Sequence, residues 1–257
     1  MIKLQYPIKD FKWGNNISQL FGVNRDLYYK NFGLEGHNGL DISVGGEKQG
    51  YGEPILAAHD GIVKDLVYET EWKTKGNGIY LESLDGSFRT IYWHLSEIQV
   101  RGNQQVKQGE VIGLMGNTGF VRPEVTPQYP RDGTHLHFSV AIKGKQSEYG
   151  DFVDPTPYLI REGDRLPIYF ARDLYYGRSG DDVSFLQTCL KLELGEEVDF
   201  EPIGYFGGKT MTAVRKLQEK YFLTPTIGYC GPKTRRFLIE RWSVFPYGYL
   251  LGKAFEI

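Results

Sequence analysis

This 257-residue chain has little cysteine, no long apolar run and no large excess of one charge, and each shortage excludes a class of protein. Two cysteines are too few for a disulfide framework and neither lies in a CxxC pair, so we expect Cys189 and Cys230 to be plain buried thiols. The 30 basic and 32 acidic residues leave a net charge of −2, which offers no positive field for nucleic acid or an anionic membrane. No stretch approaches the roughly 20 apolar residues of a bilayer-spanning helix, so we expect no membrane insertion.

The first residues also lack the apolar centre of a secretory signal. Residues 1–21 mix Lys3, Lys9, Asp10 and Lys12 with short apolar pieces, and none of these pieces reaches about 7 residues. We therefore expect a protein made in the cytoplasm without a signal peptide. A function outside the cytoplasmic membrane would then require a route of export other than a secretory signal.

Up to about residue 160, short β-branched and aromatic runs alternate with glycines and turn signals. Such runs lie at residues 61–63, 79–81, 90–93 and 111–114, and no window here sustains helical periodicity over three turns. This pattern predicts an all-β antiparallel sheet domain. Residues 119–133 contain three prolines and no periodicity, and a loop of that length inside a domain is usually functional, so we interpret it as a groove wall.

Beyond Gly177 the apolar residues recur at helical spacing, which predicts three short amphipathic helices in a small bundle. Asp181 or Ser179 would cap the first helix, and Pro232 would occupy the first turn of the third. The apolar positions are Val183, Leu186 and Leu190, then Val214, Leu217 and Tyr221, then Phe237, Leu238 and Trp242. We expect an all-β domain over residues 1–160, a linker over 161–173, a helical domain over 174–245 and a tail over 246–257.

An internal repeat precedes the last two helices. Residues 203–210, IGYFGGKT, recur as residues 227–234, IGYCGPKT, with six of eight positions identical. The glycines suit tight entries to helix starts. On the residues alone, a unit duplicated for packing is as good an interpretation as one duplicated for function.

Four of the five histidines lie in a pattern that suits metal-dependent hydrolysis: His37, His94, His135 and His137. His37 and Asp41 are four positions apart, which places both on one side of a strand or a helix. In residues 134–140, strict alternation sends both histidines to one face and the apolar Leu136, Phe138 and Val140 to the other. Two imidazoles and one carboxylate with an open fourth position form the ligand set of a catalytic zinc, so the residues suggest a hydrolase.

Two further features have plainer interpretations. His59, in the turn AAHDG, is expected to be structural or exposed. The glycines of residues 113–119 lack the GK[ST] ending of a phosphate loop, and no helix is expected after them. Nucleotide binding is therefore excluded.

Three ordered motifs resemble one family: HNGLD at residues 37–41, TIYWHLS at residues 90–96 and GTHLHF at residues 133–138. Over residues 15–159 the chain resembles the lysostaphin-type zinc endopeptidases of peptidoglycan. The resemblance implies that His37, Asp41 and His137 bind one Zn²⁺ per chain, while His94 and His135 are catalytic. Residues 120–132 are longer than the family's usual connection, which leaves substrate preference open. Tyr28 and Tyr29 do not align clearly with a tyrosine that assists catalysis in some members, so neither is assigned to the site.

Residues 174–242 resemble the three-helix peptidoglycan-binding domain, so both resemblances imply peptidoglycan as the partner. The catalytic domain comes first and no signal peptide is visible, an arrangement that resembles phage endolysins. This resemblance implies a monomer that acts on the bacterial cell wall after release. It also implies an endopeptidase that cleaves stem or cross-bridge peptides. A second hypothesis is a non-catalytic wall-binding regulator of other peptidoglycan hydrolases. A third is a zinc hydrolase of a non-wall peptide. The scissile bond stays open, as does the division of roles between His94 and His135.

Overall fold

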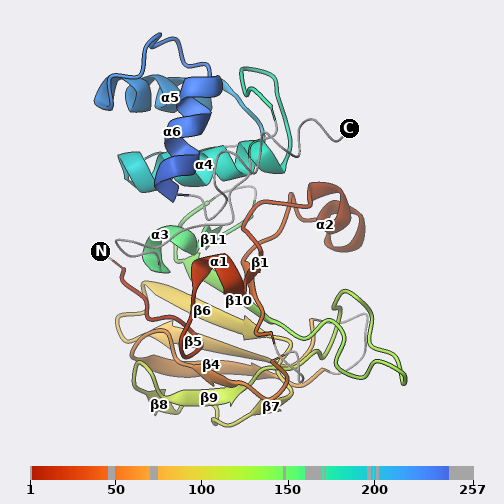
Figure 1. Ribbon diagram of the computed structural model, residues 1–257. Helices are drawn as coiled ribbons and strands as arrows, with labels where there is room; N and C mark the ends of the chain where they lie inside the picture. Colours follow the sequence, from red (N-terminus) through yellow and green to blue (C-terminus); the bar gives the residue numbers. More distant parts are fainter. Residues whose placement is uncertain are drawn as a thin grey trace. The chain divides into compact units, whose positions relative to one another are not determined.

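The computed structural model describes residues 2–45, 50–69, 75–146, 149–159, 170, 172–195, 198, 200 and 203–242 (Figure 1). The chain divides into two compact units, one of Met1–Leu20 and Asn38–Leu159, the other of Phe21–His37 and Ile160–Ile257. The expected tail over 246–257 and most of the expected linker lie outside the described residues. Within the described part, no helix is long and apolar enough to cross a membrane.

The first unit is built on two antiparallel sheets, which confirms the expected all-β domain. The larger sheet has the order β1 (Ile17–Gln19), β2 (Leu40–Ile42), β10 (Leu136–Ile142), β6 (Phe88–Trp93), β5 (Gly78–Ser83), β4 (Gly61–Val67), β8 (Gln105–Val106), and β11 (Phe152–Val153) also pairs with β10. The smaller sheet has the order β3 (Pro54–Leu56), β9 (Val111–Leu114), β7 (Glu97–Ile98). The four predicted strand runs all lie in these strands.

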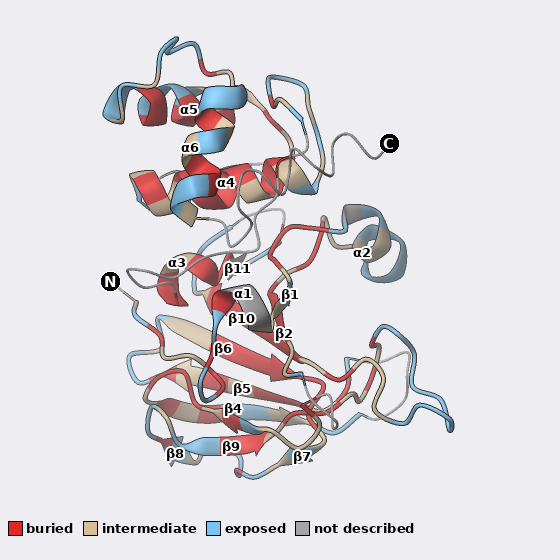
Figure 2. Cartoon of the chain, in the orientation of Figure 1, coloured by how far each residue is buried: buried red, intermediate tan, exposed pale blue. Residues whose placement is uncertain are grey.

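Strand β10 lies inside the larger sheet and is covered on both faces. Leu136, Phe138 and Val140 on one side are fully buried, and Ser139 on the other side is fully buried too. Figure 2 shows β10 and β6 as mostly buried ribbons. The alternation in residues 134–140 therefore separates an apolar face from a polar face that is also shielded from water.

Three short helices were not predicted: α1 (Trp13–Asn16), α2 (Arg25–Phe32) and α3 (Thr156–Leu159). Helix α2, in the second unit, follows Asn24 at φ 57° and ends at Gly33 at φ 67°, both left-handed conformations that suit these residue types. Its eight residues make little more than two turns. That length is too short for the three-turn periodicity that the sequence test required.

The second unit also contains the three predicted amphipathic helices, α4 (Asp181–Leu194), α5 (Gly208–Lys220) and α6 (Pro232–Trp242). Their predicted apolar positions Val183, Leu186, Leu190, Val214, Leu217 and Leu238 are fully buried. Pro232 begins α6, as expected. Cys189 and Cys230 are buried and unbonded to each other, and burial raises the pKa of both thiols, so the expectation of plain buried thiols is confirmed.

The predicted cap of α4 is wrong. The N-cap is Gly180, at φ 140°, a conformation that side chains rarely adopt, and no side chain caps the helix there. Asp181 is instead the first helical residue, where a carboxylate favours the positive end of the helix dipole. Its Oδ1 accepts a hydrogen bond from the Asn24 backbone N–H at 3.2 Å.

The internal repeat has a structural basis in two equivalent glutamines. Gln187 of α4 donates from Nε2 to Tyr205 O and Thr210 Oγ1, both at 3.0 Å, and its Oε1 accepts from Gly204 N at 2.7 Å. Gln218 of α5 makes the same three bonds one repeat later, with Tyr229 O, Thr234 Oγ1 and Gly228 N. The glutamine bonds explain the repeated threonine, and the positive φ of 74° at Gly204 and 75° at Gly228 explains the repeated glycine. The same bonds use only the backbone of the repeated tyrosine.

Candidate metal centre

Strand register brings the expected site residues of the first unit together. In β10, His137 lies opposite Asp41 of β2 on one side and opposite Trp93 of β6 on the other. Directly opposed residues in antiparallel strands point to the same face, so Asp41 and His137 project together. His94 follows Trp93 at the end of β6, and His135 stands immediately before β10.

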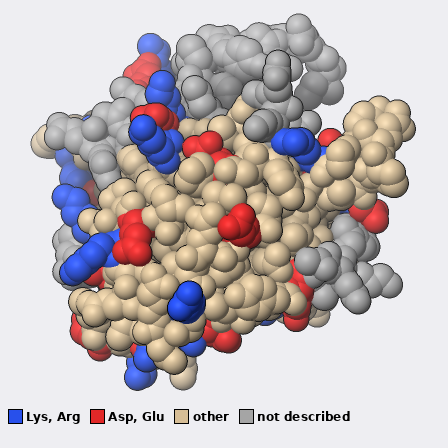
Figure 3. All heavy atoms as spheres, turned by 90° about the horizontal axis from the view of Figure 1, so that it is seen from below, with Lys and Arg blue, Asp and Glu red and all other residues tan. Residues whose placement is uncertain are grey.

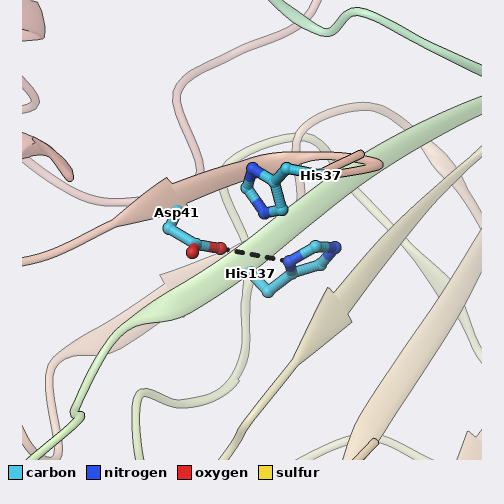
Figure 4. A group of neighbouring side chains, drawn as sticks. All are labelled: His37, Asp41 and His137. Atoms are coloured by element: carbon cyan, nitrogen blue, oxygen red, sulfur yellow. Dashed lines mark hydrogen bonds and ion pairs between the residues drawn. The ribbon is translucent and has the colours of Figure 1, made fainter. Parts of the chain in front are cut away.

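His37 joins this pair from the segment before β2. Its backbone is fixed on both sides, because Gly22 N donates to His37 O at 2.8 Å and His37 N donates to Val23 O at 3.0 Å. The ligand atoms of His37, Asp41 and His137 all lie within 4.8 Å of one another, and all three residues are buried (Figure 4). The structure therefore gathers the three residues that the family resemblance implies as metal ligands.

The hydrogen bonds of His137 suit a metal ligand. Its Nε2 is 2.9 Å from Ser139 Oγ, while its Nδ1 is 3.1 Å from Asp41 Oδ1. When Nε2 donates its proton to the serine, Nδ1 keeps a lone pair on the side of the carboxylate, which is how ligating histidines are usually oriented. A zinc ion with ligands at roughly 2.0–2.2 Å separates neighbouring ligand atoms by little more than 3 Å, so this donor set fits zinc.

Gly39 lies in close contact with His137 and its neighbours in β10. A Cβ at residue 39 would lie 2.6 Å from Phe138 O, 2.7 Å from Ser139 Oγ and 2.8 Å from His137 Nε2. Only glycine allows β2 and its preceding turn to approach β10 so closely. Sequence analysis missed both Gly39 and Ser139, although Gly39 lies inside the HNGLD motif and Ser139 is two positions beyond His137 on the same strand face.

His94 and His135 lie beside the metal cluster. The ring centroids of His94 and His135 are 4.6 Å apart, and His135 Nε2 is 3.6 Å from Asp41 Oδ1. His94 Nδ1 is 2.8 Å from Thr118 O, and His135 Nδ1 is 2.7 Å from Gly133 O. A carbonyl oxygen only accepts, so Nδ1 of each ring carries the proton and Nε2 is the basic nitrogen.

The environment of His94 is unusual in two further respects. Burial, reinforced by the nearby His135 and His137, lowers its pKa well below the ordinary histidine value. Its backbone has φ 66°, a left-handed conformation that is uncommon outside glycine and asparagine and that often marks functional sites. Both features distinguish it from an ordinary core histidine.

Residues 117–118 connect the histidines to the proline-rich stretch. Thr118, whose carbonyl holds His94, also donates from Oγ1 to Leu95 O at 3.0 Å. The side-chain amide of Asn117 donates to Pro130 O at 3.1 Å and Asp132 O at 3.0 Å. Residues 119–133 contain no helix or strand, and their role as a groove wall stays a prediction.

Three residues that the sequence analysis left out of the site are His59, Tyr28 and Tyr29. His59 is buried with Nδ1 2.8 Å from Asp60 O and Nε2 3.0 Å from Thr90 Oγ1, and it is not part of the metal cluster found among the described residues. Tyr29 is 64% exposed. Tyr28 has its ring centroid 5.2 Å from that of His37, so the tyrosine left unassigned by sequence does contact a site residue.

Two family models match the chain. Residues 35–149 match Peptidase family M23, and residues 179–238 match the family described as "Putative peptidoglycan binding domain". The first match contains all five expected site residues, and the second contains α4, α5 and most of α6.

Individual proteins match over the same region. The peptidoglycan DD-endopeptidase ShyA of Vibrio cholerae is 32% identical over 55% of this chain and 27% of its own length. Lysostaphin of Staphylococcus simulans is 27% identical over 67% of this chain and 28% of its own length. A solved structure of the S. simulans lysostaphin covers 58% of this chain and 51% of that one, with 25% identity and a TM-score of 0.42.

This chain spans less than a third of the length of either curated relative, so the similarity applies to domains rather than to whole proteins. The two family matches follow one another without overlap. The chain therefore contains a lysostaphin-type metallopeptidase domain of family M23, followed by a C-terminal peptidoglycan-binding domain.

Proposed function

We propose that the chain is a zinc-dependent endopeptidase that cleaves stem or cross-bridge peptide bonds of peptidoglycan. The observation that carries the proposal is the buried cluster of His37, Asp41 and His137, with two further histidines beside it. The matching relatives include a peptidoglycan DD-endopeptidase and lysostaphin, which supports the same chemistry and the same polymer.

The three clustered residues would hold one zinc ion. A bound zinc makes a water molecule acidic enough to attack near neutral pH and polarises the carbonyl of the scissile bond. We assign His135 as the general base that takes the proton from the attacking water at Nε2. His94 is assigned as the donor to the oxyanion. Its Nδ1 donates to Thr118 O and burial lowers its pKa, so Nε2 could donate only if it received the proton released by the attacking water, which would exchange the roles of His94 and His135.

The helical domain would hold the enzyme on its insoluble substrate. A second binding site on the same chain raises the local concentration of the catalytic domain at the wall without adding contacts at the scissile bond. All five site residues come from one chain, so a monomer suffices. On the face drawn in Figure 3, the described basic and acidic residues are interspersed. The net charge of −2 disfavours nucleic acid as the polymer.

The hypothesis of a non-catalytic regulator is not favoured. Such a regulator needs neither metal-ligating side chains that lie close together nor two further histidines beside them. All five of these residues are present, and the hydrogen bond between His137 and Ser139 would orient His137 as a ligand, which supports the enzyme. A hydrolase of non-wall peptides is disfavoured by the second domain, since residues 179–238 match a family described as a putative peptidoglycan-binding domain.

The test is digestion of purified peptidoglycan that contains no other hydrolase. We expect the chain to release fragments whose new peptide ends, read by mass spectrometry, identify one cleaved bond. Chelation should abolish the release and added zinc should restore it. Release that survives thorough metal removal would refute the zinc mechanism, whereas wall binding without any new peptide ends would support the regulator.

A further inference from the structure

In the helical domain, one segment crosses both copies of the internal repeat. Leu174 exchanges two backbone hydrogen bonds with Cys230 of the second copy, at 3.1 and 2.9 Å. Three residues later, Gly177 N donates to Phe206 O at 2.9 Å, and Phe206 N donates to Arg178 O at 2.8 Å, in the first copy. Tyr175 and Tyr176 lie between these two attachments, so each is close to one repeat.

Each of these tyrosines pairs with the repeated tyrosine of its copy. The Tyr175 and Tyr229 rings stack with centroids 6.2 Å apart and planes 29° apart, and the Tyr176 and Tyr205 rings meet at 6.4 Å and 68°. Tyr175 is 41% exposed and Tyr176 is 61% exposed, while their partners are half-buried. These four residues, the tyrosine cluster, thus present two aromatic pairs to solvent.

Two rings of the cluster, those of Tyr175 and Tyr229, are held in place before any ligand arrives. The Arg178 guanidinium lies 4.5 Å from the centroid of the Tyr175 ring and donates to its hydroxyl. The hydroxyl of Tyr229 donates to Asp173. A Cβ at Gly231 would lie 2.3 Å from Tyr229 Cε1, so the glycine leaves the space over which that ring lies.

Packing does not account for these exposed rings. The glutamine bonds to the repeat use the tyrosine carbonyls and would be made by any residue type there. Large aromatic surface left in water is unfavourable unless it is used for binding, and preorganised rings bind with a smaller entropic cost. The repeated tyrosine is therefore one part of the duplicated motif that points to a ligand.

We propose that the tyrosine cluster binds the glycan strand of peptidoglycan, with sugar rings lying on the tyrosine rings. Pyranose rings have a C–H face that suits the negative face of an aromatic ring, and their hydroxyl edges stay in water. Two neighbouring ring pairs, one stacked and one edge-to-face, suit a polymer of repeating sugars better than a single small ligand. The inference rests on the proposed wall-binding function and assigns it to a particular surface.

The experiment measures binding of the full chain, with chelator present, to intact peptidoglycan and to glycan strands stripped of their peptides by an amidase. Tyr176→Ala and Tyr205→Ala are compared with Phe222→Ala, which removes an 89% exposed ring elsewhere in the same domain. Tyr176→Phe keeps the ring without its hydroxyl. Tyr205→Leu keeps apolar bulk without the ring, so stacking is tested even if Tyr205→Ala unfolds.

We expect the unaltered chain to bind both polymers. Loss of either ring should weaken binding to stripped strands about tenfold, while Phe222→Ala and Tyr176→Phe bind normally. Unchanged binding by the Tyr176→Ala and Tyr205→Leu variants would overturn the proposal. So would an unaltered chain that binds intact peptidoglycan but not stripped strands, because the domain would then recognise the peptide. Failure of the unaltered chain to bind intact peptidoglycan would instead refute the tethering function itself.

Discussion

Replacing Gly39 by alanine should damage the metal centre although residue 39 bears no ligand atom. The added Cβ would lie 2.6–2.8 Å from Phe138 O, Ser139 Oγ and His137 Nε2, which is 0.6–0.8 Å inside the ordinary contact distance of 3.4 Å. Two of these atoms form the hydrogen bond that orients His137, and the third belongs to the backbone of β10, a strand inside the sheet. None of them is the free end of a flexible side chain, so the strain cannot be relieved locally.

Overpacking of this kind typically costs about 1–3 kcal/mol in the free energy of unfolding. Disturbing the partner of a ligating histidine lowers metal affinity roughly 10- to 100-fold. We therefore expect Gly39→Ala to show both losses, measured by urea unfolding of the metal-free chain and by competition for zinc with a chelator of known affinity.

The matched control is Gly102→Ala, where an added Cβ meets nothing within 4 Å. It should change the free energy of unfolding by less than about 0.5 kcal/mol and leave zinc affinity unaltered. If the two alanine variants have the same zinc affinity and the same stability, the close approach of β2 to β10 does not shape the site and the reasoning is refuted.

Three further predictions concern residues in β10 or immediately before it. His137→Ala should lose zinc and activity together, because one histidine and one carboxylate are too few ligands, while His135→Ala should keep zinc and lose about 10²–10⁴ in rate; metal content and turnover of both variants check this. Zinc loss in His135→Ala with retention in His137→Ala would mean that ligand and base are exchanged. Ser139→Ala should weaken zinc binding roughly 10- to 100-fold and restore near-normal turnover at saturating zinc; an unchanged zinc affinity would show that the hydroxyl does not orient the ring.

Much of the site was predictable because its residues lie on strands, where local spacing determines direction. Alternation places His135 and His137 on one side of the strand that leads into β10 and its apolar residues on the other, whatever the neighbouring strands are. The strand runs at 79–81 and 90–93 were predicted from their β-branched and aromatic residues, which lie between glycines and turn signals. The assignment of ligands came from the family resemblance, because spacing alone does not show which histidines meet Asp41.

What sequence analysis missed depends on residues that are distant along the chain. The close contact at Gly39 exists only because β2 pairs with β10, about 100 positions later. The tautomers of His94 and His135 follow from carbonyls of loop residues, which no pattern identifies. The cap of α4 was missed because the N-cap position is taken by Gly180, which has no side chain to accept a hydrogen bond and which lies between the two predicted caps.

The last prediction concerns pH and a histidine far from the chemistry. His59 is buried, donates from Nδ1 to Asp60 O, and has Nε2 beside Thr90 Oγ1; burial lowers its pKa below the model-peptide value of 6.5. The unfolded chain therefore binds a proton at this residue more readily than the folded chain does. Its contribution to stability is complete well above pH 6.5 and falls as the pH drops below that value.

The loss amounts to at most about 1.4 kcal/mol per pH unit, the value for one proton bound only by the unfolded state. His59→Gln keeps an amide that can donate and accept but cannot titrate. Urea unfolding with chelator present, at pH 7.5 and pH 5.5, should show a larger decrease in the unaltered chain than in the variant, by up to about 1.4 kcal/mol. The other histidines contribute equally to both proteins, so they cancel in the difference. Equal decreases would mean that His59 takes up its proton as easily in the folded chain, and that its burial does not oppose its charge.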